Sequence, residues 1–165
     1  MKSILFAAVL AGNALMAGYP VKLEKLPLKT LPADTYAKLA KGKHLTWVWK
    51  EEGFDASKGF QIGDVAMKSE NRSGEILAYL KEQLNLIEKK GAAYILNVTL
   101  VDYSGGNPFL GPDITLEGTI TKQGKSVACF VDKEISASHR NGNKGGWDPK
   151  PAVDAFIGNL DKGMD

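Results

Sequence analysis

Residues 73–103 constrain the fold most, because an amphipathic helical pattern passes into an alternating strand pattern at a single glycine. Before Gly91, apolar residues recur at steps of three and four and share one helical stripe: Ile76, Leu77, Leu80, Leu84 and Ile87. After Gly91 the period is two, and one face is wholly apolar, with Tyr94, Leu96, Val98 and Leu100. We therefore expect a helix that Ser73 caps and that ends near Lys90, followed by an interior strand.

The rest of the chain predicts shorter elements on both sides of this unit. Alternation predicts a strand over residues 45–50, in which Trp47 and Trp49 share a face and anchor the core; a ligand-stacking platform is the alternative. A short strand is expected over residues 60–65. A short helix that Asp34 caps should end near Gly42. Asp148 should cap the closing helix, with Pro149 in its first position.

The segment DITLEGTIT shows the cleanest alternation in the chain. Its polar face is expected to be solvated, and carries Thr115, Glu117, Thr119 and Thr121. A turn over residues 122–125 completes a hairpin with the next strand. This order of elements predicts an α+β fold, a two-layer sandwich with a mainly antiparallel sheet of four or five strands and two main helices on one face. A helix between two strands permits a parallel crossover, so a mixed sheet is also allowed.

The beginning of the chain has the layout of a secretory signal. MKSILFAAVLAGNALMA combines one basic residue, an apolar run and small residues near Ala17. The run is too short to span a membrane, which takes about 20 residues. We expect residues 1–17 to be cleaved, residues 18–43 to form a proline-punctuated basic arm with a short helix, and residues 44–165 to form one domain. The protein is then periplasmic or secreted, without stable membrane insertion, and Gly18 stands where a lipidated protein would carry cysteine.

Charge is distributed unevenly along the expected mature chain. Residues 18–50 hold seven lysines and two acidic side chains, so their charge is +5, whereas residues 51–165 hold 13 basic and 17 acidic side chains, so their charge is −4. The basic part could bind an anionic surface through residues 22–50, or could simply be solvated. Cys129 is the only cysteine, which excludes an intramolecular disulfide, and its apolar surroundings in the sequence predict a buried structural thiol.

Few residues suit catalysis or metal binding. His44 and His139 are the two histidines, the G-x-S-x-G motif of serine hydrolases is absent, and no histidine has a second ligand at metal-binding spacing. The sequence therefore predicts no catalytic residue, no metal and no cofactor. A glycosidase-type pair of carboxylates among the 19 acidic side chains is the alternative. Glycosylation sequons begin at Asn71 and Asn97, and Asn97 falls within an expected strand.

Two glycine-rich loops remain as candidates for contact with a partner. The first, SGGNPFLGP over residues 104–112, presents two apolar residues that either form a contact tip or tuck into the core. The second, over residues 138–147, could bind an anion with its cations or serve as a flexible connection. The candidate contact residues are Asn107, Phe109, Leu110, His139, Arg140, Lys144 and Trp147. The expected partner is another envelope protein or a small ligand, and not a nucleic acid.

Residues 45–160 resemble small uncharacterised bacterial envelope proteins and lipoproteins. The shared segments are LTWVW, the apolar helix leading to AAYILNVTLVDYSGG, the ITLEGTIT hairpin and a terminal helix. Some of those proteins resemble the amino-terminal domain of TolB, a small α/β module that works by protein contact, and no functional residue transfers from it. The expected function is that of an exported, non-catalytic envelope module that binds through loops at one end of its sheet. The alternatives are a periplasmic hydrolase-type enzyme using carboxylates or His139, and an anionic-surface binder.

Overall fold

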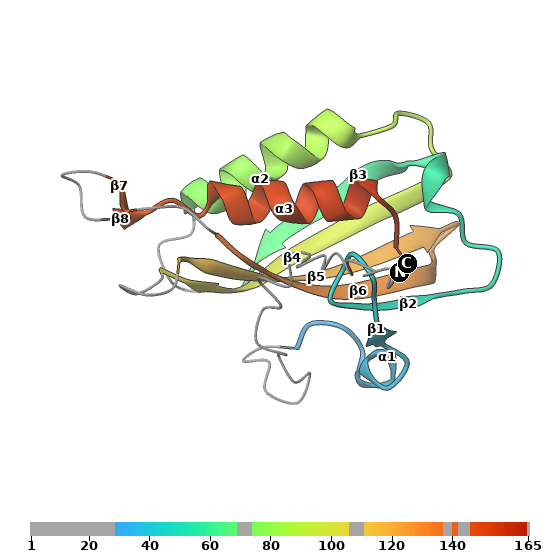
Figure 1. Ribbon diagram of the computed structural model, residues 1–165. Coiled ribbons are helices and arrows are strands. Elements are labelled where there is room, and N and C mark those ends of the chain that lie inside the picture. The colour runs from blue at the N-terminus through green and yellow to red at the C-terminus, as the bar shows by residue number, and fades with distance from the viewer. Residues whose placement is uncertain (1–28, 69–73, 106–110, 137–139, 142–145, 165) are drawn as a thin grey trace, which may run out of the picture.

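The computed structural model describes residues 29–68, 74–105, 111–136, 140–141 and 146–164, with the backbone alone at 140–141 and 146–147. The expected signal over residues 1–17 lies outside them. The described strands form a main sheet in the order β1-β2-β6-β5-β4-β3 (Figure 1). Its strands are β1 (Ala40–Lys41), β2 (Trp47–Lys50), β3 (Phe60–Met67), β4 (Tyr94–Ser104), β5 (Asp113–Lys122) and β6 (Lys125–Ile135). Only β3 and β4 pair in parallel within this sheet, so the α+β prediction with a mainly antiparallel sheet is confirmed.

Two helices, α2 (Gly74–Ile87) and α3 (Lys150–Asp161), cover one face of the sheet, and α1 (Ala33–Tyr36) lies on the other (Figure 1). A 3-10 turn, η2 (Ala56–Lys58), precedes β3. The predicted helical stripe is confirmed, since Ile76, Leu80 and Leu84 of α2 are buried against the sheet. The helix ends at Ile87, earlier than expected, and Gly91 adopts a φ of 79°, which glycine tolerates best. Among the described residues, no helix combines the length and apolar character needed to cross a membrane.

The prediction of four or five strands is wrong, because the main sheet has six strands. The additional strand is β1, whose residues are predicted to belong to the end of the short helix. The helix stops at Tyr36, and the Gly42 amide donates to the Thr46 carbonyl at 3.2 Å in a turn that pairs β1 with β2. A Cβ atom on Gly42 would lie 2.2 Å from the Leu45 carbonyl oxygen, so this close approach requires glycine. Asp34 lies inside the first turn of α1, after Pro32, and does not cap it.

The two tryptophans of β2 lie on the face away from the long helices. Leu45 precedes the strand and joins the main core, whereas Trp47 and Trp49 are half-buried beside Leu31 and Cys129 in a second apolar cluster. The two tryptophans do share a face, but that face belongs to the second cluster and not to the main core, so the expectation that they anchor the core is wrong. Residues 29–39 pack on them, and this part of the expected basic arm is here called the arm.

The polar face of β5 is not solvated where the arm crosses it. Thr115 is 2% exposed and Glu117 is 1% exposed, against the prediction of a solvated face. Both oxygens of the Glu117 carboxylate are occupied by the arm: Tyr36 donates its hydroxyl to Oε1 at 2.5 Å, and Thr30 donates its amide to Oε2 at 2.7 Å and its hydroxyl to the same oxygen. These bonds satisfy a buried charge that would otherwise be costly.

The core between the sheet and α3 depends on a glycine in β5. Gly118 pairs with Phe130, and a Cβ atom on Gly118 would lie 2.1 Å from the Phe130 ring. The ring therefore lies directly over the β5 backbone, and it meets Phe156 of α3 at 5.7 Å between centroids. The Lys150 amide donates to Oδ1 of Asp148 at 3.0 Å, but α3 begins at Lys150 and its N-cap is Pro149. The predictions of Asp148 as the cap and of Pro149 in the first helical position are therefore each wrong by one residue.

Candidate functional site

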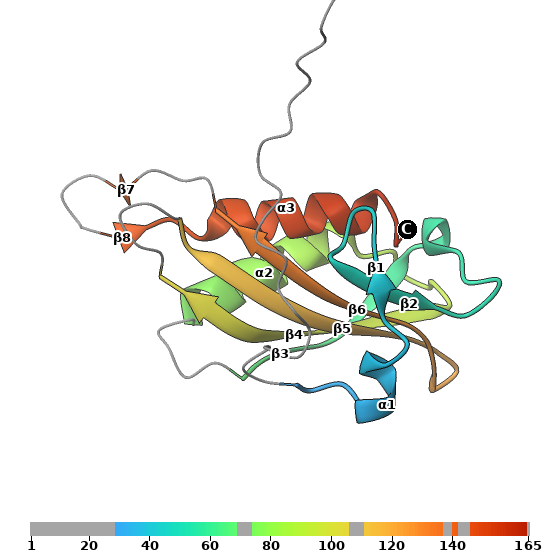
Figure 2. The ribbon, with the colours of Figure 1, turned by 60° about the horizontal axis from the view of Figure 1, so that its bottom comes forward.

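The two candidate loops leave the sheet at the same end. Ser104, the last residue of β4, pairs with Asp113, the first residue of β5, and Asp113 pairs with Ile135, the last residue of β6. The segment after β6 leads to α3, which also begins at this end, and β3 finishes beside Leu100 nearby (Figure 2). We call this the loop end. Segments that are far apart in the sequence lie together at this end of the sheet.

The second candidate loop contains a small hairpin. The strands β7 (Arg140–Asn141) and β8 (Gly146–Trp147) pair antiparallel, with Arg140 opposite Trp147. The sequence predicted only a turn-rich connection here. The hairpin forms next to the start of α3 and brings two of the candidate contact residues to facing backbone positions (Figure 2).

The other candidate contact residues lie outside the described residues. These are Asn107, Phe109, Leu110, His139 and Lys144. The structure does describe the residues at the bases of their loops. The contacts that fix these bases could not be predicted from the sequence patterns.

Ser136 ties the bases of both loops together. Its amide donates to the Pro112 carbonyl at 2.7 Å, and its hydroxyl donates to the Asp148 carbonyl at 2.7 Å. A Cβ atom on Gly111 would lie 1.8 Å from the Ser136 carbonyl oxygen, so the first loop returns in close contact with the chain after β6. Ser136 is 1% exposed. One buried serine therefore fixes where the first loop returns and where the second segment enters α3.

An ion pair lies at the same end, on the arm side of the sheet. The Lys133 ammonium is 3.2 Å from Oδ1 of Asp113, and both side chains are largely buried. Because Asp113 is the first residue of β5, this pair holds the strand at the point where the first loop returns.

A pair of carboxyl groups on β6 was not identified from the sequence. Asp132 and Glu134 lie two residues apart on the helix face of the sheet, in line with Phe130, so their side chains are neighbours on that face. Asp132 is fully buried, and its Oδ1 accepts from the amide and the hydroxyl of Thr46, both at 2.9 Å. The Asn159 amide group of α3 donates to Oε1 of Glu134 at 2.7 Å.

Burial and the neighbouring Asp132 charge raise the pKa of Glu134 to about 8, and burial also raises the pKa of Asp132. A carboxylic acid that keeps its proton at neutral pH can donate it, which is the property needed in a general acid. The two groups are neighbours on one strand, however, whereas the two carboxyl groups of a glycosidase stand on either side of the bond that they cleave. The alternation of residues along β6 places both acids on the same face as Phe130. This alternation is the sequence feature from which the pair could have been identified.

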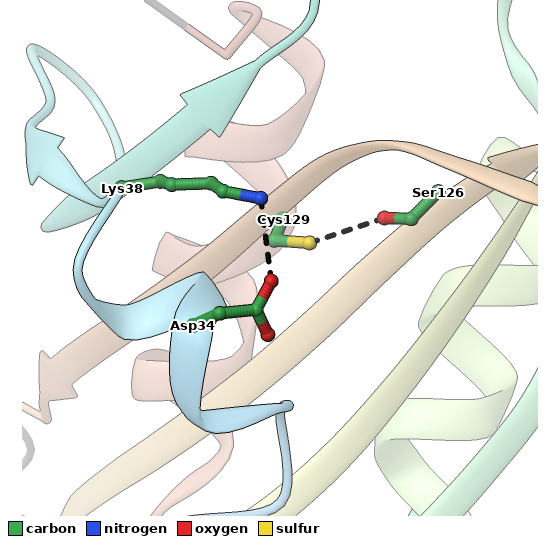
Figure 3. A network of polar contacts seen from close by, with 4 residues as sticks. All are labelled: Asp34, Lys38, Ser126 and Cys129. Carbon is green, nitrogen blue, oxygen red and sulfur yellow. Dashed lines mark hydrogen bonds and ion pairs between the residues drawn. The ribbon is translucent and has the colours of Figure 1, made fainter.

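Cys129 is buried beneath the arm, as predicted (Figure 3). Its sulfur lies 3.3 Å from the Ser126 hydroxyl, and the Asp34–Lys38 ion pair of 3.4 Å lies near it. Burial raises the pKa of the thiol, which disfavours the reactive thiolate. Asn97 falls within β4, where its side chain accepts from the Asp64 amide at 2.9 Å. In the part of the chain that the structure describes, no three His, Cys, Asp or Glu side chains are grouped to hold a metal ion.

Comparison with known proteins does not assign a family. No family model matches the sequence, and no curated protein matches it. Among solved structures, a chain of the PelC dodecamer from Paraburkholderia phytofirmans is similar over 58% of this chain and 82% of that chain. The sequence identity is 14% and the TM-score is 0.39, too low to support a conclusion about fold or function. The expected resemblance to TolB and to envelope proteins stays a prediction.

Proposed function

We propose that this protein is an exported, non-catalytic module of the cell envelope that binds a partner protein through the loop end. The observation that supports this proposal most is the strand register, because Ser104, Asp113 and Ile135 are aligned across three strands. Both candidate loops therefore leave the sheet at the same end, and loops held on a sheet in this way commonly supply binding residues.

The anchoring at the loop end also favours binding. Ser136 fixes the bases of the two segments with two hydrogen bonds of 2.7 Å, so less freedom would be lost when a partner binds. The β7–β8 hairpin adds an arginine opposite a tryptophan, two residue types that contribute strongly to protein interfaces.

Site-specific photo-crosslinking in cells tests the proposal. A photoreactive residue at position 107, 109 or 147 should give the same discrete crosslinked partner. The matched control is position 123, an exposed position in the β5–β6 turn at the opposite end of the sheet. A partner captured equally from position 123, or no partner from any loop position, would count against binding through the loop end.

Export is tested separately by the amino terminus of the mature protein. A periplasmic or secreted protein with the expected signal should begin at Gly18 and appear in the periplasmic fraction or the medium. A protein that keeps Met1 and stays with the cytoplasm would overturn the envelope assignment while leaving the loop end available for another partner.

The carboxyl pair gives the hydrolase alternative its most specific support. Glu134 keeps a proton at neutral pH and is only partly buried, so it could act as an acid. Asp132, in contrast, is fully buried and is engaged by Thr46. These contacts favour a structural role for the pair, which is developed below.

A further inference from the structure

The carboxyl pair joins three parts of the fold that are distant in the sequence. Asp132 accepts two hydrogen bonds of 2.9 Å from Thr46, in the turn before β2. Glu134 accepts one of 2.7 Å from Asn159, near the end of α3. The Thr46 hydroxyl also accepts a hydrogen bond from the Lys133 amide at 3.1 Å. This bond joins the Thr46 turn to β6 just past Trp47 and Val131, where the pairing of β2 with β6 ends.

The hydrogen bonding of the second carboxylate oxygen of Asp132, Oδ2, indicates how the two carboxyl groups interact. Oδ2 is buried and receives no hydrogen bond from an N–H group or a hydroxyl of the described residues. The neighbouring Glu134 carboxyl group, on the same face of β6, can supply this oxygen with a hydrogen bond. Two carboxyl groups can form that bond only if one of them carries a proton. A buried carboxylate oxygen without such a bond would be strongly unfavourable.

We propose that Asp132 and Glu134 share one proton and act as a proton-dependent latch that fastens the Thr46 turn and the C-terminal end of α3 to β6. When the proton leaves to solvent, two negative charges face each other in a buried position. Their repulsion is relieved when the Glu134 side chain swings outward, which breaks its bond to Asn159 and frees the end of α3.

The groups around the latch offer little compensation for a second negative charge. From β5, Leu116 and Ile114 pair with Asp132 and Glu134 and are apolar. From the turn before β2, Thr46 contributes neutral donors. From α3, Asn159 is neutral, and Lys162 just after the helix is the cation that favours ionised Glu134. Lys133 lies on the opposite face and pairs with Asp113. Burial and the Asp132 charge outweigh Lys162, because the pKa of Glu134 is raised.

The latch should therefore be closed in acidic and neutral solution and should loosen above about pH 8. The two carboxyl groups titrate as a unit, so the transition belongs to the pair. Below that pH, opening that releases the whole proton becomes up to about tenfold more favourable for each unit by which the pH rises.

Amide hydrogen exchange at the end of α3 tests the latch in the full-length protein. Exchange rates at residues 158–162, corrected for the intrinsic pH dependence of exchange, should show protection falling by at least about tenfold between pH 6 and pH 9. Glu134→Gln keeps a neutral donor beside Asp132, and should keep this protection at pH 9. The matched control Asp154→Asn changes an acid earlier in α3, whose partner is Tyr79, and should leave the pH dependence intact.

Two results would overturn the latch: protection that does not change with pH in the wild type, or an unchanged pH dependence in Glu134→Gln. If Glu134→Gln does not fold, carbon-13 NMR titration of the wild-type carboxyl groups decides the question. A shared proton gives two separate steps, the upper one above pH 7, whereas two steps near the ordinary carboxyl values would exclude sharing.

Discussion

The Tyr36 hydroxyl donates a 2.5 Å hydrogen bond to the Glu117 carboxylate, across 81 positions of sequence. Tyr36 belongs to α1 on the arm, and Glu117 belongs to the centre of β5. Burial and the neighbouring carboxylate raise the pKa of the Tyr36 hydroxyl, so it remains a donor at any physiological pH. This bond joins the arm to the sheet and holds the arm over the buried Cys129.

Tyr36→Phe should loosen the arm without removing its apolar contacts. The change deprives a buried charge of one donor, and we expect the free energy of unfolding to fall by about 1.5–3 kcal/mol. Because Cys129 lies beneath the arm, its reaction with a thiol reagent should also accelerate. Denaturant unfolding and the rate of thiol labelling measure the two effects.

Tyr79→Phe is the matched control for this prediction. The Tyr79 hydroxyl donates to Asp154 at 2.8 Å, but at an exposed site. The same loss of one hydroxyl should there cost at most about 1 kcal/mol and leave Cys129 labelling unchanged. Equal effects of the two changes would show that the buried bond to Glu117 has no special weight.

Burial of Glu117 marks the limit of what the sequence could predict about the fold. The helical stripe of α2 and the apolar face of β4 could be predicted because each pattern faces one core. The alternation of β5 also showed correctly which residues share a face. Whether the polar face meets water depends on what covers it, and that cover comes from Thr30 and Tyr36, 87 and 81 positions away.

The candidate site shows the same division between local and distant information. Glycine content predicted the two loops, and the strand register confirms that they share one end of the sheet. The tie through Ser136 could not be predicted, since its partners Pro112 and Asp148 come from different segments. The alternation of Asp132 and Glu134 is visible in the sequence, but the hydrogen bond from Asn159 to Glu134 depends on the packing of α3 on β6.

Gly118→Ala should be strongly destabilising. The added methyl group would lie 2.1 Å from the Phe130 ring, which contacts Phe156 and cannot move freely. Overpacking of this kind costs about 1–3 kcal/mol or more. Thermal unfolding should show a lower melting temperature.

Gly158→Ala provides the opposite case within α3. A Cβ atom at Gly158 meets nothing within 4 Å, and alanine is favoured over glycine inside a helix by about 1 kcal/mol. The melting temperature should stay constant or rise. A loss of stability at Gly158 as large as that at Gly118 would contradict the packing described between α3 and β6.

Phe156→Ala should remove the largest fully buried side chain of α3. Phe156 is fully buried and meets Phe130, so its truncation leaves a cavity and should cost about 3–5 kcal/mol. Leu86→Ala is the control, because Leu86 is 73% exposed and its truncation should change the free energy of unfolding by no more than about 0.5 kcal/mol. Urea unfolding of both variants separates core burial from helix propensity, and similar losses for the two would be inconsistent with the described core.

Global stability should fall as the pH rises from about 5 to 8. The pKa of Glu134 is about 8 in the folded protein and about 4.3 in an unfolded chain, so within this window folding takes up a proton. The free energy of unfolding then decreases with pH and becomes level above the folded pKa. One full proton corresponds to about 1.4 kcal/mol per pH unit, and the partial exposure of Glu134 should make the measured slope smaller.

Urea unfolding at several pH values measures this slope. Glu134→Gln should flatten it, whereas Glu51→Gln, which changes an exposed acid paired with Lys125, should leave it unchanged. The comparison isolates Glu134 because each variant removes one carboxyl group and only Glu134 belongs to the pair. A wild-type free energy that stays constant or increases between pH 5 and pH 8 would contradict the assignment of a proton to the Asp132–Glu134 pair, since folding must take up that shared proton over this range.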